Sequence, residues 1–166
     1  MKQIISNNKS ERADGAKITK IVLMASLMQN AEAQAIELQK PRRQRSFHYI
    51  IGCDGSVIQG VPEDFRAWSA MCRSVDDISI SILFCTMGST KCGITPETWK
   101  ALTELCADIC KRYAIEPYLG AYDLNKGSVI PYFIGADLRQ NMATFLSDVK
   151  EKKKEKKTRK KGGASK

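Results

Sequence analysis

Residues able to carry out acid–base, nucleophilic or metal chemistry are few in this sequence. It contains one histidine, His48, and six cysteines. Zinc enzymes usually hold the metal with two or three imidazoles, and a Ser–His or Cys–His nucleophile needs a histidine beside it. A Cys72 nucleophile assisted by His48, and a thiolate metal site made of Cys53, Cys85 and Cys92, remain as alternatives. Because no second imidazole is present, we expect His48 to be a hydrogen-bonded structural residue. Because no C-x-x-C pair is present, we expect the cysteines to serve mostly as small core residues.

The positive charge of the chain is concentrated at its C-terminal end. Lys and Arg number 27 against 18 Asp and Glu, a net charge of +9, and residues 150–166 alone hold ten Lys or Arg and two Glu, a net of +8. The remaining 149 residues therefore carry a net charge of +1. We expect residues 150–166 to form a flexible basic tail, which either keeps the protein soluble or attracts nucleic acid or another anionic polymer through charge alone.

Composition excludes several classes of protein. At 43% apolar residues, a body of this length can bury one self-sufficient core, which excludes a wholly disordered chain, a collagen-like repeat and a disulfide-dominated miniprotein. No apolar run reaches the roughly 18–20 residues of a membrane-spanning helix, and the first residues lack the apolar segment of a signal peptide. We therefore expect a protein without a membrane span, made in the cytoplasm, with reduced cysteines.

Several segments show clear secondary-structure patterns. Residues 18–23 are rich in β-branched residues and predict a buried strand, and residues 31–38 are helix formers that precede a break at Pro41. Asp54 and Gly55 predict a hairpin turn between strands at 47–51 and 56–59. Residues 78–85 alternate, with Ile80, Ile82 and Phe84 on one face and Leu83 on the other.

Two amphipathic helices are predicted in the second half of the chain. Thr95 is a good N-cap before a proline at the first helical position, and apolar residues then recur at spacings of three and four as far as Tyr113. A second helical period runs from Leu138 to Val149. The order of elements predicts an α/β fold with a single mixed β-sheet flanked by helices. We expect a loose lead-in over residues 1–16, one domain over residues 17–149 and the basic tail over residues 150–166.

Five short motifs occur in a consistent order along the chain. They read FHYIIGCDGSVIQGVPE at residues 47–63, AWSA at 67–70, SISILFC at 79–85, TPETW at 95–99, and AYD at 121–123 followed by Lys126 and IPYF at 130–133. This series resembles the zinc-dependent N-acetylmuramoyl-L-alanine amidases of the type 2 class. That class includes bacterial and phage cell-wall lytic enzymes and is related to peptidoglycan recognition proteins. The resemblance covers about residues 18–149 and implies their fold, with a groove for peptidoglycan.

The sequence departs from this family at the positions of its catalytic residues. The resemblance places the three zinc ligands at Met24, Ala121 and Ile130, and the catalytic carboxylate at Leu83. Lys126 alone keeps a catalytic residue type. A thioether and two aliphatic side chains do not replace imidazole or carboxylate ligands, so we expect no zinc and no other cofactor.

The resemblance also implies which residues surround the groove. Phe47 stands where some members have a tyrosine, Ser69 stands where they have a histidine, and Trp68 either lines the groove or belongs to the core. The whole expected set is Met24, Phe47, His48, Trp68, Ser69, Leu83, Ala121 and Lys126. Arg42, Arg43 and Arg45 could contact an anionic wall polymer or the carboxylates of a stem peptide, or form an ordinary solvated loop.

These observations lead to one hypothesis and three alternatives. The hypothesis is a catalytically inactive amidase-like protein that binds peptidoglycan or muropeptides. The alternatives are an active amidase with an altered site around Lys126, a scaffold protein of phage or mobile-element origin, and a nucleic-acid-binding protein acting through residues 150–166. A chain without an export signal is consistent with release by phage lysis, by analogy with the family.

Overall fold

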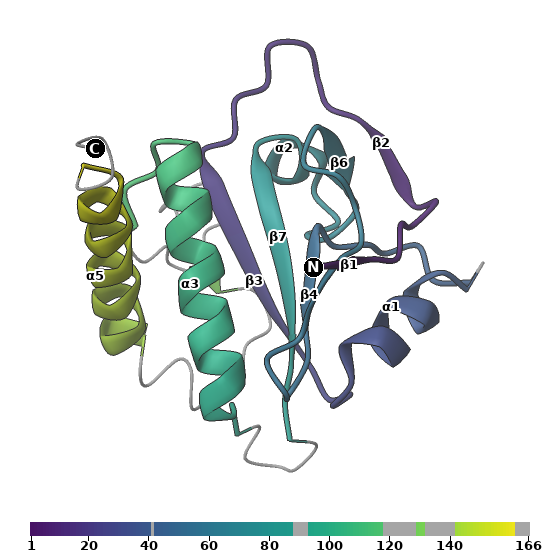
Figure 1. Cartoon of the computed structure of the whole chain (residues 1–166). Helices are drawn as coiled ribbons and strands as arrows, with labels where there is room; N and C mark the ends of the chain where they lie inside the picture. Colours follow the sequence, from purple (N-terminus) through teal and green to yellow (C-terminus); the bar gives the residue numbers. More distant parts are fainter. Residues whose placement is uncertain (41, 88–92, 118–128, 132–141, 162–166) are drawn as a thin grey trace.

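The structure is a computed structural model that describes residues 1–40, 42–87, 93–117, 129–131 and 142–161 (Figure 1). A mixed six-stranded sheet lies at its centre, which confirms the predicted fold class. Its strands, in spatial order, are β1 (Lys2–Gln3), β5 (Val57–Gln59), β4 (Tyr49–Ile51), β7 (Ser79–Cys85), β3 (Lys20–Ser26) and β8 (Val129–Pro131). β4 and β5 are antiparallel, and every other neighbouring pair is parallel.

The predicted hairpin joins β4 and β5. Gly55 has a φ of +78°, a backbone conformation that glycine adopts without steric cost, and the Asp54 carboxylate accepts hydrogen bonds from the backbone N–H and the hydroxyl of Ser56. The turn therefore forms from its own local contacts.

Four helices are described: α1 (Ala31–Leu38), the short α2 (Arg73–Asp76), α3 (Pro96–Arg112) and α5 (Met142–Lys161). Thr95 caps α3 as predicted, because its side chain accepts a hydrogen bond from the Thr98 N–H. None of the helices within the described residues has the length and apolar character needed to cross a membrane.

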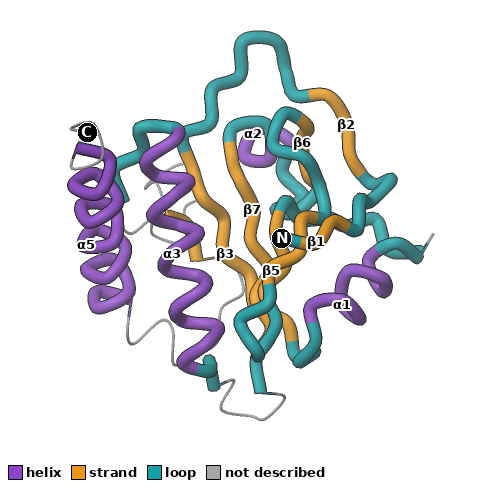
Figure 2. The backbone as a smooth tube through the Cα atoms, in the orientation of Figure 1, coloured by secondary structure: helices purple, strands orange, loops and turns teal. Residues whose placement is uncertain are grey.

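Helices cover the two faces of the sheet, and the alternation along β7 decides which side chains meet which helix (Figure 2). Ile80, Ile82 and Phe84 are fully buried in the cluster that includes the apolar sides of α3 and α5. Leu83 points to the opposite face and packs with α1. The predicted division of this strand into two faces is confirmed.

The first 16 residues differ from the expected loose lead-in. β1 extends the edge of the sheet beside β5, and β2 (Lys9–Glu11) pairs with β6 (Phe65–Ala67) in a separate two-stranded sheet. Between the two strands, Ser6 is buried and its N–H donates to the Gly60 carbonyl over 2.8 Å. Strand pairing relies on backbone hydrogen bonds, so this polar segment folds onto the domain without the apolar pattern that would have predicted it.

Residues 150–166, expected to form a flexible tail, are partly helical. α5 begins at Met142 and continues to Lys161, so residues 150–161 are helical, whereas Leu138 and residues 162–166 lie outside the described residues. Lys152 pairs with Glu104 of α3 at 3.2 Å, and Lys153 pairs with Glu116 at 2.7 Å. These contacts attach the first part of the segment to the domain.

Candidate binding groove

A groove of about 370 Å³ opens where β3 ends and α1 begins. Its buried part consists of apolar side chains from β3, α1, β7 and the segment before β4, namely Met24, Leu38, Leu83 and Phe47. Its polar side chains come from the same region of the chain and are Ser26, Gln34, Glu37, Arg43 and Arg45. The groove therefore combines an apolar floor with a polar and mainly cationic rim, a combination typical of sites that bind and orient small ligands.

Met24 and Leu83 form the centre of the floor. They are direct partners in the parallel register of β3 and β7, and each is 4% exposed. Both belong to the apolar cluster in which α1 covers this face of the sheet, together with Phe47 and Ile50. Three of the residues expected around the groove, Met24, Phe47 and Leu83, thus line one cavity.

The arginines of residues 42–45 have different surroundings. Arg42 and Arg43 pair with Glu37, at 3.7 and 3.3 Å. Arg45 instead lies over the floor: its Nη1 is 3.8 Å from the sulfur of Met24, and its Nη2 is 3.1 Å from the sulfur of Met71. Within the described part of the chain, no carboxylate pairs with the half-buried Arg45. A thioether is a weak acceptor, so this guanidinium lacks a strong partner.

The N-terminal segment holds the arginine-bearing loop in place. The side-chain amide of Asn8 donates to the carbonyls of Leu38 and Arg45, each at 3.4 Å, and to the carbonyl of Arg43. The Ser46 hydroxyl in turn donates to the Asn8 carbonyl. Asn8 is therefore a positioning residue for the rim, which the sequence analysis did not identify, since nothing local distinguishes it from the other polar residues near the N-terminus.

His48 lies beneath the sheet surface and does not line the groove. Its Nδ1 accepts a hydrogen bond from the Ser81 N–H at 2.9 Å, and its Nε2 lies 3.1 Å from the Phe65 carbonyl and 2.9 Å from Arg12. Burial, together with the Arg12 charge, lowers the pKa of His48 from 6.5 to about 3. The imidazole is therefore neutral and hydrogen-bonded, as expected for a structural histidine.

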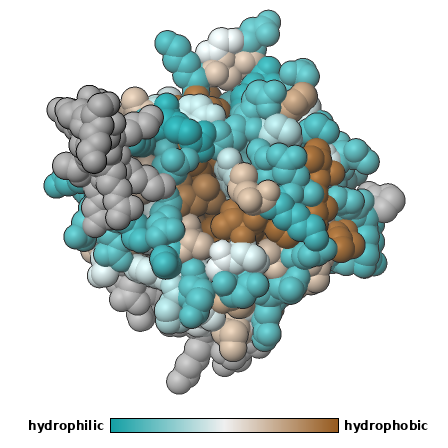
Figure 3. All heavy atoms as spheres, in the orientation of Figure 1, coloured by the Kyte–Doolittle hydropathy of each residue, from teal (hydrophilic) through white to brown (hydrophobic). Residues whose placement is uncertain are grey.

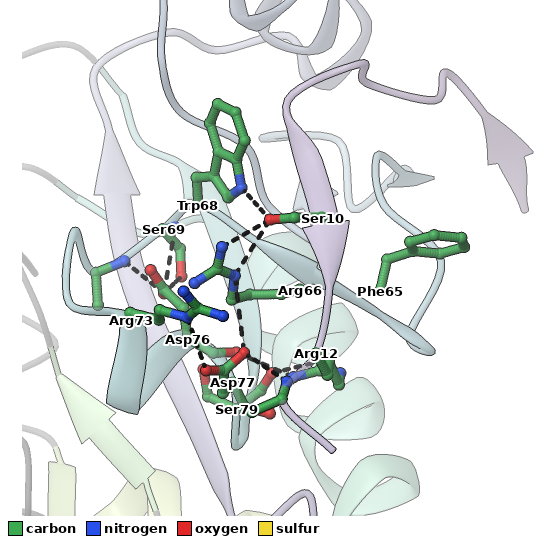
Figure 4. Close-up of polar contacts among 12 residues, drawn as sticks. Ser10, Arg12, Phe65, Arg66, Trp68, Ser69, Arg73, Asp76, Asp77 and Ser79 are labelled. Carbon is green, nitrogen blue, oxygen red and sulfur yellow. Dashed lines mark hydrogen bonds and ion pairs between the residues drawn. The ribbon is translucent and has the colours of Figure 1, made fainter. Parts of the chain in front are cut away.

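Trp68 and Ser69 belong to a polar cluster around α2 and not to the groove lining (Figure 4). The Trp68 indole N–H donates to the Ser10 hydroxyl, and the Ser69 hydroxyl donates to the Asp76 carboxylate, both at 2.8 Å. Burial raises the pKa of Asp76, although hydrogen bonds from Ala70 and Ser69 oppose the rise. In this structure both residues tie β2 and α2 to the domain.

Arg12 connects the same cluster to the rest of the sheet. Its guanidinium donates to the carbonyls of Asp76, Asp77 and Ser79 and its Nε donates to that of Glu63, over 2.7 to 3.0 Å. Four backbone carbonyls from three segments thus meet one side chain of the N-terminal segment.

Comparison with known proteins places this architecture in a family. The sequence pattern of the family described as N-acetylmuramoyl-L-alanine amidase matches residues 14–130. The chain belongs to this amidase family. None of the curated proteins matches the chain.

Solved structures share the amidase fold. Staphylococcus aureus AmiA, a hydrolase solved with its ligand, has a TM-score of 0.68 and 14% identity, over 92% of this chain and 82% of AmiA. A point mutant of PlyL has a TM-score of 0.67 and 15% identity, over 90% and 98% of the two chains. A mutant endolysin from Bacillus subtilis has a TM-score of 0.60 and 18% identity, over 89% and 97%. At these identities the likeness shows the fold alone.

The side chains at the positions where the sequence resemblance places the zinc site do not fit a zinc ion. Met24 provides one neutral thioether, Leu83 provides no donor, and the Arg45 guanidinium brings a positive charge within 3.8 Å of that thioether. Across the described ranges, no three His, Cys, Asp or Glu side chains lie close enough together to hold a metal. By residue type, Ala121 and Ile130 have no side-chain donor either.

Part of the expected amidase site lies outside the described residues. Ala121 and Lys126 are in the range 118–128, and only the backbone of Ile130 is described, opposite Val22 in the pairing of β8 with β3. In the sheet, β3 lies between β8 and β7. The strand that carries Met24 therefore separates the backbone of Ile130 from Leu83.

A second hollow of about 410 Å³ lies between the N-terminus and α3 on the opposite face of the sheet. Figure 3 shows apolar side chains reaching the surface at the centre of this face, beside α3. Of its charged side chains, Glu104 pairs with Lys152, and Arg112 pairs with Asp108 at 2.8 Å and with Glu63, which also accepts hydrogen bonds from the hydroxyls of Tyr49 and Tyr113. Since these groups satisfy one another, the groove beside Met24 is the better candidate for a binding site.

Proposed function

We propose that this member of the amidase family binds peptidoglycan or muropeptides without hydrolysing them. The observation that supports the proposal is the pairing of Met24 with Leu83 in the floor of a groove that remains open, with about 370 Å³ of space. The family resemblance assigns a zinc ligand to the first position and the catalytic carboxylate to the second. Both positions now carry apolar side chains, and the cavity around them persists.

The chemistry of amide hydrolysis explains why these replacements remove activity. The metal ion polarises the carbonyl and lowers the pKa of its bound water to about 7, and a carboxylate transfers protons. A thioether and an isobutyl group do neither, and the nearby guanidinium of Arg45 repels a divalent cation. The protein is thus expected to purify without stoichiometric zinc and to release no stem peptide.

The lining of the groove is compatible with binding of a peptide. An apolar floor with a charged rim suits the stem peptide of peptidoglycan, which has small apolar side chains and carboxylates. The groove volume lies within the range of roughly 300–1,000 Å³ that is usual for small-ligand sites.

Co-sedimentation of the full-length protein with purified peptidoglycan sacculi tests the proposal. We expect pelleting that persists at about 0.5 M salt, where exposed charge pairs are largely screened. The control variant replaces Lys156, Lys157, Lys160 and Lys161 with glutamine, and it should pellet as well as the wild type. Muropeptide release and bound zinc are measured on the same preparation.

The outcomes separate the proposal from the alternatives. Stoichiometric zinc or release of stem peptide would show an active amidase. Pelleting that disappears in the lysine variant would show charge attraction by the basic segment, and pelleting that disappears with salt alone would show attraction by exposed charges elsewhere on the protein. Absence of pelleting would mean that the protein keeps the amidase fold without binding the cell wall, and it would favour a scaffold role.

A further inference from the structure

Arg45 is the one charged group in the groove whose surroundings do not account for its charge. Arg42 and Arg43, its neighbours in the same loop, pair with Glu37, whereas among the described residues the guanidinium of Arg45 donates only to the sulfurs of Met24 and Met71. A partly buried guanidinium beside thioethers is poorly compensated, because thioethers are weak acceptors. A carboxylate is the kind of group that would compensate this charge, because it accepts two hydrogen bonds from a guanidinium.

Hydrogen bonds from the N-terminal segment fix the loop that carries Arg45. Asn8 bonds to the carbonyls on both sides of the loop, at Leu38 and at Arg45, and the Ser46 hydroxyl bonds back to Asn8. This strap reduces the conformational freedom that the loop would lose when a ligand binds. Arg45 therefore has a preorganised position over the groove floor.

The floor below Arg45 limits the kind of anion. Met24, Phe47, Leu38 and Leu83 are each at most 8% exposed, so a ligand part that contacts them must be apolar. The guanidinium presents two parallel N–H donors, which match the two oxygens of a carboxylate. The combination selects a ligand with a carboxylate next to a small apolar group.

We propose that the groove binds an acidic peptide, with Arg45 holding a peptide carboxylate over the site where the amidase family holds its metal. This inference rests on the proposed function, since it names the part of the wall fragment that the groove recognises. The guanidinium of Arg45 would thus attract the ligand's oxygen atoms in place of a metal ion, but it would not activate a water molecule.

Calorimetric titration of the full-length protein with a matched pair of probes tests the inference. The first probe is N-acetyl-L-alanyl-D-glutamic acid, and the second is the same compound with both carboxyl groups converted to amides. We expect the wild type to bind the acid at least tenfold more tightly than the diamide, because a charge-assisted pair is lost. Arg45→Gln should bind the two probes with affinities within twofold of each other.

Arg42→Gln is the matched control, because Arg42 lies in the same loop, is exposed and pairs with Glu37. It should keep the tenfold preference for the acid. Thermal unfolding of both variants within a few degrees of the wild type shows that the fold is intact. An Arg45→Lys variant should recover part of the preference, since the charge returns without the planar pair of donors.

Three results would overturn the inference: equal affinity of the wild type for acid and diamide, no binding of either probe, or an undiminished preference in Arg45→Gln. If the sacculi still pellet in those cases, the proposed wall binding stands and only the role of Arg45 falls. If the preference for the acid depends on Arg45 but sacculi do not pellet, the groove recognises acidic peptides and the wall proposal falls.

Discussion

Met24 and Leu83 face each other across the parallel pair β3 and β7, and both pack under α1 with 4% of their surface exposed. In the amidase family, the resemblance assigns a metal ligand and a catalytic carboxylate to these two places. A carboxylate at position 83 would be buried under α1, among apolar side chains.

Leu83→Glu should therefore destabilise the protein in a pH-dependent way. Burial raises the pKa of the new carboxyl above its unfolded value, so the variant is most stable at about pH 4 and below, and it loses stability as pH rises through the folded pKa. We expect a loss of about 2–4 kcal/mol at pH 7. Urea denaturation at several pH values measures it, and Leu83→Gln, which does not titrate, should show no such pH dependence.

His48 should make stability fall in mild acid. Its pKa is lowered from 6.5 to about 3 by burial and by Arg12, so the unfolded chain binds the proton more readily and stability decreases as pH falls from 6.5 toward 3. Between pH 6.5 and 4.5 the lost contribution is about 2–3 kcal/mol. Comparing urea denaturation of the wild type and His48→Gln at both pH values isolates this contribution, and equal slopes in the two proteins would contradict it.

Asn8→Ala should weaken the groove without unfolding the domain. Removing the amide frees the carbonyls of Arg43 and Arg45, so the loop gains freedom and binding of the acidic probe falls several-fold. Asn7→Ala is the control, because Asn7 is exposed and no hydrogen bond of its side chain is described. An equal loss of affinity in both variants would show that the N-terminal segment acts as a whole and that Asn8 has no special role.

Phe145→Ala should detach α5 from the domain. Phe145 is fully buried and meets Trp99 of α3 edge to face, with ring centroids 5.4 Å apart. We expect the free energy of unfolding to fall by about 3–5 kcal/mol, as for other buried aromatic residues. Urea denaturation followed by tryptophan fluorescence measures the loss, and Thr144→Ala, at an exposed position of the same helix, should have little effect.

The periodic parts of the chain were predictable from sequence. The alternation of β7, the capped start of α3 and the Asp54–Gly55 turn depend on residues within a few positions of one another, and the structure has all three. The motifs at residues 47–99 were also sufficient to indicate the amidase family, and the family match over residues 14–130 confirms it. Local spacing contains this information because strand and helix periods are properties of short segments.

The contents of the candidate site were only partly predictable. Met24, Phe47 and Leu83 line one cavity, whereas Trp68 and Ser69 contact Ser10 and Asp76 in another cluster. The sequence determined that the residue types for metal chemistry are scarce. Only the tertiary structure decided that Arg45, and not Arg42 or Arg43, lies over Met24 and that Asn8 holds its loop. These contacts join residues 21 to 37 positions apart, and they depend on the order of strands in the sheet and not on local spacing.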